Sequence, residues 1–145
     1  MIGLLQRVLS ASVTVDGEVV GAISTGILVF VGVERVDSEK RAQRLLDRLL
    51  GYRVFDDGSG RMNLSVLDVG AAMLLVPQFT LVADTEKGMR ASFAPAADPE
   101  PSRRLFDFLV AQARERCSHV ESGRFGADMK VALVNDGPVT FWLRA

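Results

Sequence analysis

The order of apolar and polar positions predicts strands in the first part of the chain, followed by a helix. Within residues 2–33, "SVTVDGEVV" alternates around Asp16-Gly17, which predicts a type I′ hairpin, and the apolar run "GILVFVGV" predicts a strand buried on both faces. From Ser38, which suits an N-cap, apolar residues recur at helical spacing as far as Gly51. These apolar positions are Ala42, Leu45, Leu46, Leu49 and Leu50. We therefore expect three strands and one amphipathic helix.

The second part of the chain predicts a further helix between strands. "YRVF" leads into the glycine-rich loop "DDGSGRMN", and "AAMLLV" predicts a buried strand that ends at Pro77. Residues 83–98 form a long polar connection of the kind that often carries function. Pro99 and Pro101 suit a helix start, and the apolar stripe that follows is Leu105, Phe106, Phe108, Leu109, Ala113 and Cys117. "MKVALV" and "VTFWL" predict closing strands around "NDGP".

These elements predict an α+β fold with α/β/β layers, in which two main helices cover one face of largely antiparallel or mixed β-sheets. A length of 145 residues suits a single domain spanning residues 1–145. The chain has no apolar run near 18 residues, and no basic segment precedes the first apolar residues. We therefore expect a cytoplasmic protein without a membrane segment.

Composition excludes several kinds of chemistry. Cys117 is the single cysteine and His119 the single histidine, so we expect no disulfide, no familiar zinc site and no metal or other cofactor. The motif G-x-S-x-G is absent, which argues against a hydrolase triad built on His119. A net charge of −1 gives no overall sign of nucleic-acid binding. A local phosphate-binding patch remains open for six arginines, namely Arg41, Arg44, Arg48, Arg53, Arg103 and Arg104.

Two short segments have both a simple and a functional interpretation. In "VPQFTLVADT", Gln78, Phe79 and Thr80 follow a buried strand, where they suit a pocket wall with exposed backbone N–H donors. The local pattern alone favours an ordinary strand with alternating faces. In "NDGP", the simple interpretation is a hairpin turn, whereas the functional one is that Gly137 and Pro138 present their carbonyl oxygens rigidly. The sequence leaves the isomer of this Gly-Pro bond open.

Both segments belong to a wider resemblance. "PQFTL" and "NDGPVT", together with "ASVTVDGEVVG", "LGYRVFDDGSGRMNLSV", "ADTEKGMRASF" and "GRFGADMKVALVNDGPVTFWL", resemble the D-aminoacyl-tRNA deacylase family over essentially the whole chain. The resemblance implies a homodimer that hydrolyses the ester between a D-amino acid and the 3′-terminal adenosine of tRNA, with free D-amino acid and tRNA as products. Glycyl-tRNA, which has no side chain to exclude, is expected to be a substrate as well.

The resemblance also assigns residues to the catalytic step. It implies that Gln78, Phe79 and Thr80 lie beside the scissile ester and that the N–H groups of Phe79 and Thr80 stabilise the developing oxyanion. Thr80 is not expected to be the nucleophile, because no base that could activate it is evident. The 2′-hydroxyl of the substrate's adenosine is instead expected to assist attack by water.

Five further residues are assigned to substrate binding. The resemblance implies a cis Gly137–Pro138 step that reaches into the pocket of the partner subunit and excludes L side chains. Arg7 resembles the residue that braces this step. Phe125 and Met129 match positions that line an adenine pocket.

Two alternatives stay open. Pro77 stands where the family usually has serine, and it resembles a related branch of deacylases with relaxed chirality, which acts on certain L-aminoacyl-tRNAs. That branch lacks an aromatic residue of the Phe79 type, so "QFTL" favours the D-specific family. The other alternative is a non-catalytic dimer that only holds an RNA 3′ end, because no side-chain base is evident.

Overall fold

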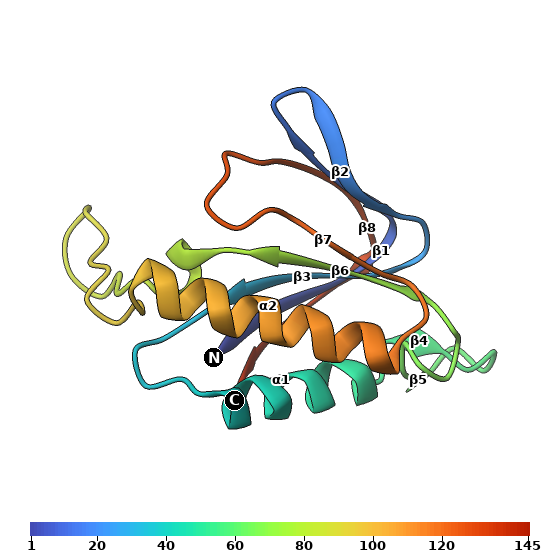
Figure 1. The fold of residues 1–145 in the computed structure, drawn as a ribbon. Helices are drawn as coiled ribbons and strands as arrows, with labels where there is room; N and C mark the ends of the chain where they lie inside the picture. The colour runs from blue at the N-terminus through green and yellow to red at the C-terminus, as the bar shows by residue number, and fades with distance from the viewer.

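A computed structural model describes residues 1–145 and contains one strongly curved six-stranded sheet (Figure 1). Its strands are β1 (Ile2–Val15), β2 (Glu18–Ile23), β3 (Gly26–Gly32), β6 (Ala72–Pro77), β7 (Val120–Ser122) and β8 (Lys130–Arg144). Their order is β2-β1-β3-β6-β7, and β8 pairs with the free edge of β1. A second, two-stranded sheet consists of β4 (Phe55–Asp56) and β5 (Met62–Leu64).

The predicted hairpin and helices are present. Asp16 and Gly17 have φ angles of 51° and 84°, as the type I′ turn between β1 and β2 requires. Helix α1 (Glu39–Gly51) buries all five residues of its predicted apolar face. Helix α2 (Pro99–Arg116) buries most of its predicted stripe, and Cys117 directly after it is buried too. None of the helices combines the length and apolarity needed to cross a membrane.

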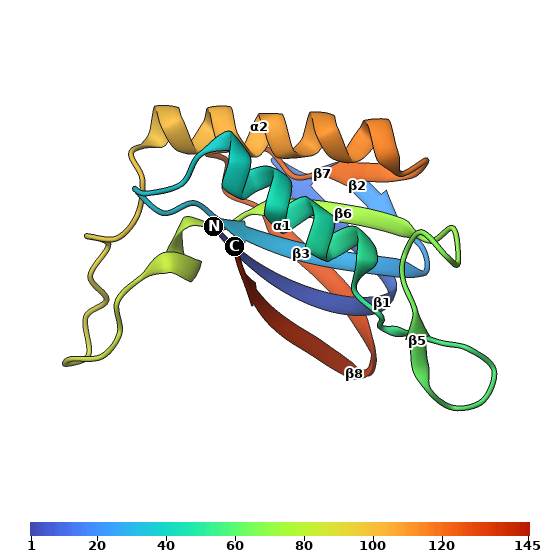
Figure 2. The ribbon, with the colours of Figure 1, turned by 90° about the horizontal axis from the view of Figure 1, so that it is seen from below.

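Three layers result from these elements. β3 connects to β6 through α1, and β6 to β7 through α2; both strand pairs are parallel, so the helices cover the same face (Figure 2). On the other face, β2 and the adjoining ends of β1 and β8 curl over β3 and β6 and enclose a second apolar cluster. The predicted α+β fold with two helices on one face of a mixed sheet is confirmed.

The hairpin interpretation of "NDGP" is wrong. β8 continues through this segment, and both of its halves pair with the 14-residue strand β1. Asn135 lies opposite Val8 and Thr140 opposite Gln6, so β8 has extra residues that bulge out of the ladder. Residues 136–139, the β8 bulge, therefore leave the chain direction unchanged. Turn-forming residues alone do not distinguish a bulge from a reversal, because both need the same backbone freedom.

The strand interpretation of the segment after Pro77 is also wrong. Residues Phe79–Val82 form a 3₁₀ helix, η1, which begins directly beyond the end of β6. The ladder with β3 ends here, where Gln78 N–H donates to the Val31 carbonyl oxygen over 2.8 Å. Gly32 lets η1 approach, since a Cβ at this position would lie only 2.7 Å from the side chain of Val82.

Candidate functional site

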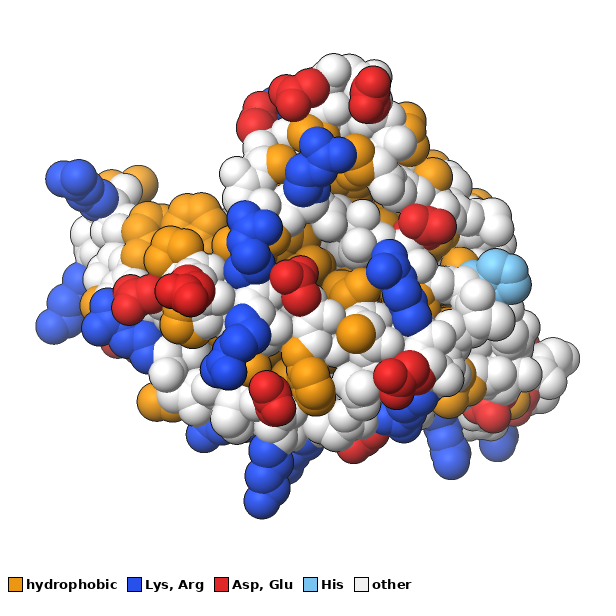
Figure 3. All heavy atoms as spheres, in the orientation of Figure 1, with side chains coloured by type: hydrophobic (Ala, Val, Ile, Leu, Met, Phe, Trp, Pro, Cys, Tyr) orange, Lys and Arg blue, Asp and Glu red, His pale blue; other side chains and the backbone are white.

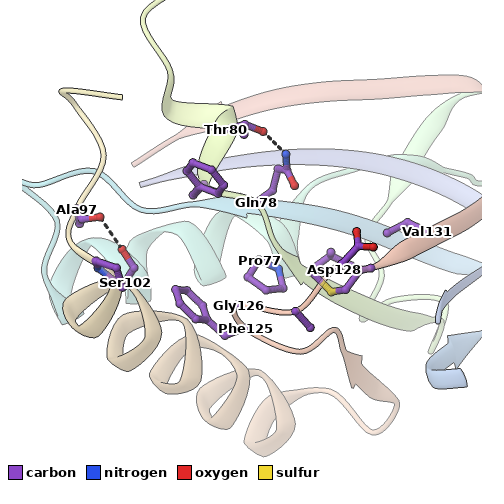
Figure 4. A pocket seen from close by; sticks show the side chains of 14 residues that line it. Pro77, Gln78, Thr80, Ala97, Ser102, Phe125, Gly126, Asp128 and Val131 are labelled. Carbon is purple, nitrogen blue, oxygen red and sulfur yellow. Dashed lines mark hydrogen bonds between the residues drawn. The ribbon is translucent and has the colours of Figure 1, made fainter. Parts of the chain in front are cut away.

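A cavity of about 560 Å³ lies between the end of β6, η1, the first turns of α2 and the β7–β8 loop (Figure 4). We call it the main pocket. Fourteen residues line it: Val76, Pro77, Gln78, Phe79, Thr80, Ala97, Pro99, Ser102, Phe125, Gly126, Ala127, Asp128, Met129 and Val131. Five of the eight site residues predicted from the sequence are among them. The fold thus joins segments almost 50 positions apart in the chain.

One end of the main pocket carries the residues predicted to act on the ester. Gln78 and Thr80 point toward each other in Figure 4, and the Gln78 side-chain amide donates a hydrogen bond to the Thr80 hydroxyl oxygen. The ring of Phe79 is exposed and lies 5.1 Å from the ring of Phe93, which belongs to the long connection 83–98. That connection therefore contributes an aromatic side chain to the surroundings of the site.

The start of η1 supplies backbone donors. The first N–H groups of a 3₁₀ helix have no carbonyl partner within the helix, and here these groups belong to Phe79 and Thr80. The next one, of Leu81, already donates to the Gln78 carbonyl oxygen over 3.3 Å. Donors of this kind are suited to stabilise negative charge on an oxygen atom.

The opposite end of the main pocket is aromatic and contains sulfur. Phe125 lies at a turn of the β7–β8 loop, and its ring centroid is 6.4 Å from that of Phe106 in α2. The guanidinium carbon of Arg103 lies 5.1 Å from the Phe125 ring centroid. Met129 is held nearby, because Gly123 leaves room for its sulfur atom. These groups form a half-buried surface on which a flat ring can stack.

Gly137, Pro138 and Arg7 do not line the main pocket of their own chain. The Gly137–Pro138 bond is cis, the isomer that the resemblance implied, and both residues are exposed. Arg7 Nε donates to the Asp136 carbonyl oxygen over 3.0 Å and pairs with its carboxylate, while Arg7 Nη1 donates to the Val54 carbonyl oxygen. Asn135 Oδ1 accepts a hydrogen bond of 2.8 Å from Val139 N–H. The β8 bulge is therefore braced from both sides.

Two polar residues of the main pocket were missed by sequence reasoning. Ser102 is buried in the first turns of α2 and donates to the Ala97 carbonyl oxygen over 3.2 Å. Asp128 is the single ionisable side chain in the lining, and Lys130 Nζ lies 2.8 Å from its carboxylate. A polar residue near a helix start or in "GADMK" is too common a pattern to indicate a site. Only the tertiary structure shows that the β7–β8 loop and α2 lie side by side and bring these two residues into one pocket.

Other candidate groups lie elsewhere. His119 is exposed outside the pocket, and its Nδ1 lies 3.0 Å from the Ser118 hydroxyl oxygen. In the glycine-rich loop, hydrogen bonds from Ser59 and Asn63 lower the pKa of the Asp57 carboxyl to about 2, so this group serves the loop itself. Nowhere in residues 1–145 do three or more His, Cys, Asp or Glu side chains gather so that they could hold a metal ion.

Comparison with known proteins identifies the family. The family model described as D-Tyr-tRNA(Tyr) deacylase matches residues 4–144. A D-aminoacyl-tRNA deacylase of Alkalilimnicola ehrlichii is 63% identical over 145 residues, which are 100% of this chain and 97% of the relative. A D-aminoacyl-tRNA deacylase of Thioalkalivibrio sulfidiphilus is 64% identical over 143 residues, which are 99% of this chain and 96% of the relative.

Two solved structures share the fold. A structure named "c-Myc DNA Unwinding Element Binding Protein" superposes with a TM-score of 0.94 at 36% identity and covers 100% of this chain and 99% of its own. A probable eukaryotic D-amino acid tRNA deacylase, at 17% identity, shares the fold with a TM-score of 0.84 over 99% of this chain and 98% of its own. The family model and the two relatives confirm the family predicted from the motifs, and the chain belongs to the D-Tyr-tRNA(Tyr) deacylase family.

Proposed function

We propose that this chain hydrolyses the ester bond of D-aminoacyl-tRNA, and that of glycyl-tRNA, to release the free amino acid and reusable tRNA. One observation carries the proposal: the main pocket has Gln78 and Thr80 at one end and Phe125 and Met129 at the other. A volume of about 560 Å³ lies in the range of small-molecule sites and suits an aminoacyl-adenosine. The ester then lies at η1 and the adenine at the β7–β8 loop.

The chemistry requires little from the protein's side chains. Water adds to the ester carbonyl carbon, and the N–H groups of Phe79 and Thr80 stabilise the negative oxygen of the tetrahedral intermediate. The bond to the adenosine 3′ oxygen then breaks, and that oxygen receives a proton. The substrate's own 2′-hydroxyl assists the transfer. Thr80, whose hydroxyl oxygen accepts a hydrogen bond from Gln78, positions the acyl group and does not attack it.

Phe125 and Met129 hold the terminal adenine. Stacking on an aromatic ring and contact with a thioether are common ways to bind an unpaired base. Arg103 above the Phe125 ring fixes the orientation of this aromatic surface. The binding energy of the adenosine thus keeps the ester beside η1.

The active unit is a homodimer. A second hollow of about 370 Å³, the outer hollow, shares Gln78 and Thr80 with the main pocket and is also lined by Leu4, Phe30 and Leu81. Next to Leu4 across the β1–β8 ladder lies Trp142, whose residue surface is 56% exposed. A second copy that covers this sheet face brings its β8 bulge into the outer hollow. Because a two-fold interface is self-complementary, both pockets are completed at once.

Selectivity follows from the partner's Gly137 and Pro138. Their carbonyl oxygens hold the α-amino group of the substrate, and the backbone around them leaves no room for an L side chain. A D side chain points away from this wall and is accepted whatever its size. Glycine has nothing to exclude and is accepted as well.

The test is single-turnover deacylation of D-tyrosyl-tRNA and L-tyrosyl-tRNA in parallel, with and without a metal chelator. We expect rapid loss of the D ester alone, unchanged by the chelator. Substantial loss of the L ester would instead assign the chain to the relaxed-chirality branch suggested by Pro77. If neither ester is lost but the RNA 3′ end binds, the chain is a binding module and the proposal is wrong.

A further inference from the structure

A groove outside the main pocket carries positive charge. It has a volume of about 370 Å³ and runs between α2 and the β7–β8 loop. Its lining is Arg103, Phe106, Asp107, Val110, Ala111, Arg114, Ser122, Gly123, Arg124 and Phe125. We call it the arginine groove. In Figure 3, blue side chains stand over α2 on both sides of a strip where apolar atoms are exposed.

The charge of the groove is not neutralised within the chain. Arg103 and Arg114 are eleven positions apart, which places them on one face of α2, and Arg124 belongs to the loop opposite. No carboxylate lies within 4.0 Å of any of these three guanidinium groups, although other arginines of the chain are paired. Asp107 is the single acidic residue of the groove. Three cations against one carboxylate favour an anionic ligand.

The groove adjoins the main pocket at a defined end. Phe125 lines both, and Arg103 bridges them because it lies over the Phe125 ring and its Nη2 lies 3.4 Å from the Phe125 carbonyl oxygen, within hydrogen-bond distance. The ester end of the main pocket, at Gln78 and Thr80, borders the outer hollow instead, because these two residues line both. A nucleotide whose base stacks on Phe125 therefore has its 3′ substituent toward η1 and its 5′ phosphate toward the arginine groove.

We propose that the arginine groove binds the phosphodiester backbone of the unpaired nucleotides that precede the terminal adenosine. This inference rests on the function proposed above and adds a second binding site for the same substrate. Guanidinium groups suit phosphate because they offer several N–H donors in a fixed plane. Because Phe125 lines both cavities, it sets the direction of the RNA strand. The exposed apolar atoms of the groove floor contact ribose and base. The arginine groove does not contact the amino acid, so its binding does not depend on which amino acid the tRNA carries.

The test compares D-tyrosyl-tRNA with D-tyrosyl-adenosine, both as 3′ esters. The second substrate lacks all the nucleotides that precede the terminal adenosine and therefore has nothing to place in the arginine groove. The variants are Arg114→Gln and Arg124→Gln, which leave Phe125 and its contact with Arg103 in place. The matched control is Arg104→Gln, because Arg104 is an exposed arginine of the same helix that lines neither cavity. The readouts are kcat/KM, KM and their dependence on salt concentration.

We expect each groove variant to lower kcat/KM for D-tyrosyl-tRNA about three- to tenfold through KM, and to reduce the salt slope by about 0.7 to 1. The hydrolysis of D-tyrosyl-adenosine and the Arg104→Gln control should be unchanged. Equal losses on both substrates, or no loss on the tRNA, would overturn the groove assignment and leave the proposed function intact. Failure of the unmodified chain to hydrolyse either ester would reject the function itself.

Discussion

Gly137 occupies a backbone conformation that side chains rarely adopt. Its φ angle is 140°, and a Cβ would lie 2.6 Å from the Val139 side chain and 2.9 Å from the Val139 nitrogen. Both distances are below any normal contact, so an added methyl group has to displace the β8 bulge. Gly137 and Pro138 are exposed, and Val139 is the residue of the bulge that packs against the core. A change at Gly137 should therefore affect the site more than the stability of the fold.

Gly137→Ala should therefore impair activity more than folding. Shifts of about 1 Å at a positioning group can cost about 10²-fold in rate, and we expect a loss of that order for D-tyrosyl-tRNA in single turnover. The control is Gly17→Ala, which has a φ of 84° with open space around it. It should lose about 1–2 kcal/mol of unfolding free energy and keep its activity. Equal activity in both variants would remove Gly137 from the mechanism.

Asp128 is the residue that tests whether a side-chain base takes part. A general base contributes about 10²–10⁴-fold to the rate. Because the proposed mechanism relies on the substrate's 2′-hydroxyl, Asp128→Asn should change kcat by less than about tenfold. Rates on D-tyrosyl-tRNA and on a 2′-deoxy substrate decide the matter: a severe loss with Asp128→Asn, and none with the 2′-deoxy ester, would make Asp128 the base.

At the scale of elements, the position of η1 depends on a glycine in the neighbouring strand. Gly32 ends β3, and a Cβ there would lie 2.7 Å from Val82 and 3.3 Å from the Gln78 carbonyl oxygen. η1 carries Phe79 and Thr80. Its distance from β3 therefore determines where the proposed oxyanion donors, the N–H groups of these two residues, lie in the main pocket. Because Gly32 has no side chain, η1 can pack closely against β3, and this packing positions the site.

Gly32→Ala should push η1 away from the sheet and lower kcat for D-tyrosyl-tRNA by about 10²-fold, the cost of one lost oxyanion donor. Its KM should change less. Gly3→Ala is the matched control, since Gly3 is also buried in the sheet but its Cβ would meet only side-chain atoms of Leu45 and Val29, at 3.3 and 3.4 Å. Parallel losses of kcat in both variants would show that general loosening of the sheet is responsible.

The whole molecule leaves the outer face of the β8-β1-β3 region without cover, with Trp142 as its largest exposed apolar group. Trp142→Glu should convert the proposed dimer into a monomer, as measured by sedimentation equilibrium, and abolish deacylation because each pocket loses its partner's Gly137. Leu67→Glu, at an exposed apolar residue of a turn beyond β5, should leave mass and activity unchanged. A monomeric wild type with full activity would contradict the dimer proposal.

Both ends of the described chain meet at one buried carboxylate. Burial raises the pKa of Glu34, but hydrogen bonds from Arg144 and the amino group of Met1 outweigh it, so the pKa lies below its usual value of 4.5. A lowered pKa means that the carboxylate stabilises the fold above about pH 4.5 and that this contribution is lost as the pH falls further.

Glu34→Gln should therefore lower the unfolding free energy at pH 7. Removing one partner of a fully buried pair costs about 3–5 kcal/mol, and we expect about 2 kcal/mol here because the Arg144 side chain is largely exposed. Denaturant unfolding at several pH values measures this difference. The gap between wild type and variant should shrink below pH 4.5, whereas a gap that is constant down to pH 3 would contradict the assignment.

The sequence by itself determined the features whose causes lie within a few residues. Asp16 and Gly17 prescribe their turn through backbone freedom, and the spacing of apolar residues between Ser38 and Gly51 specifies one helical face. The motifs around Phe79 and Pro138 indicated the family, because the same residue types stand in the same order in the motifs of that family. Each of these inferences needs no knowledge of what packs against the segment.

The tertiary structure alone decided the remaining features. "NDGP" became a bulge because β1 is long enough to pair with both halves of β8, and the segment after Pro77 became η1 because Gly32 lets it approach. Asp128 lines the main pocket, and Arg124 lines the arginine groove, because the β7–β8 loop lies against α2. In each case the decisive partner is distant in the sequence, and local patterns carry no information about such a partner.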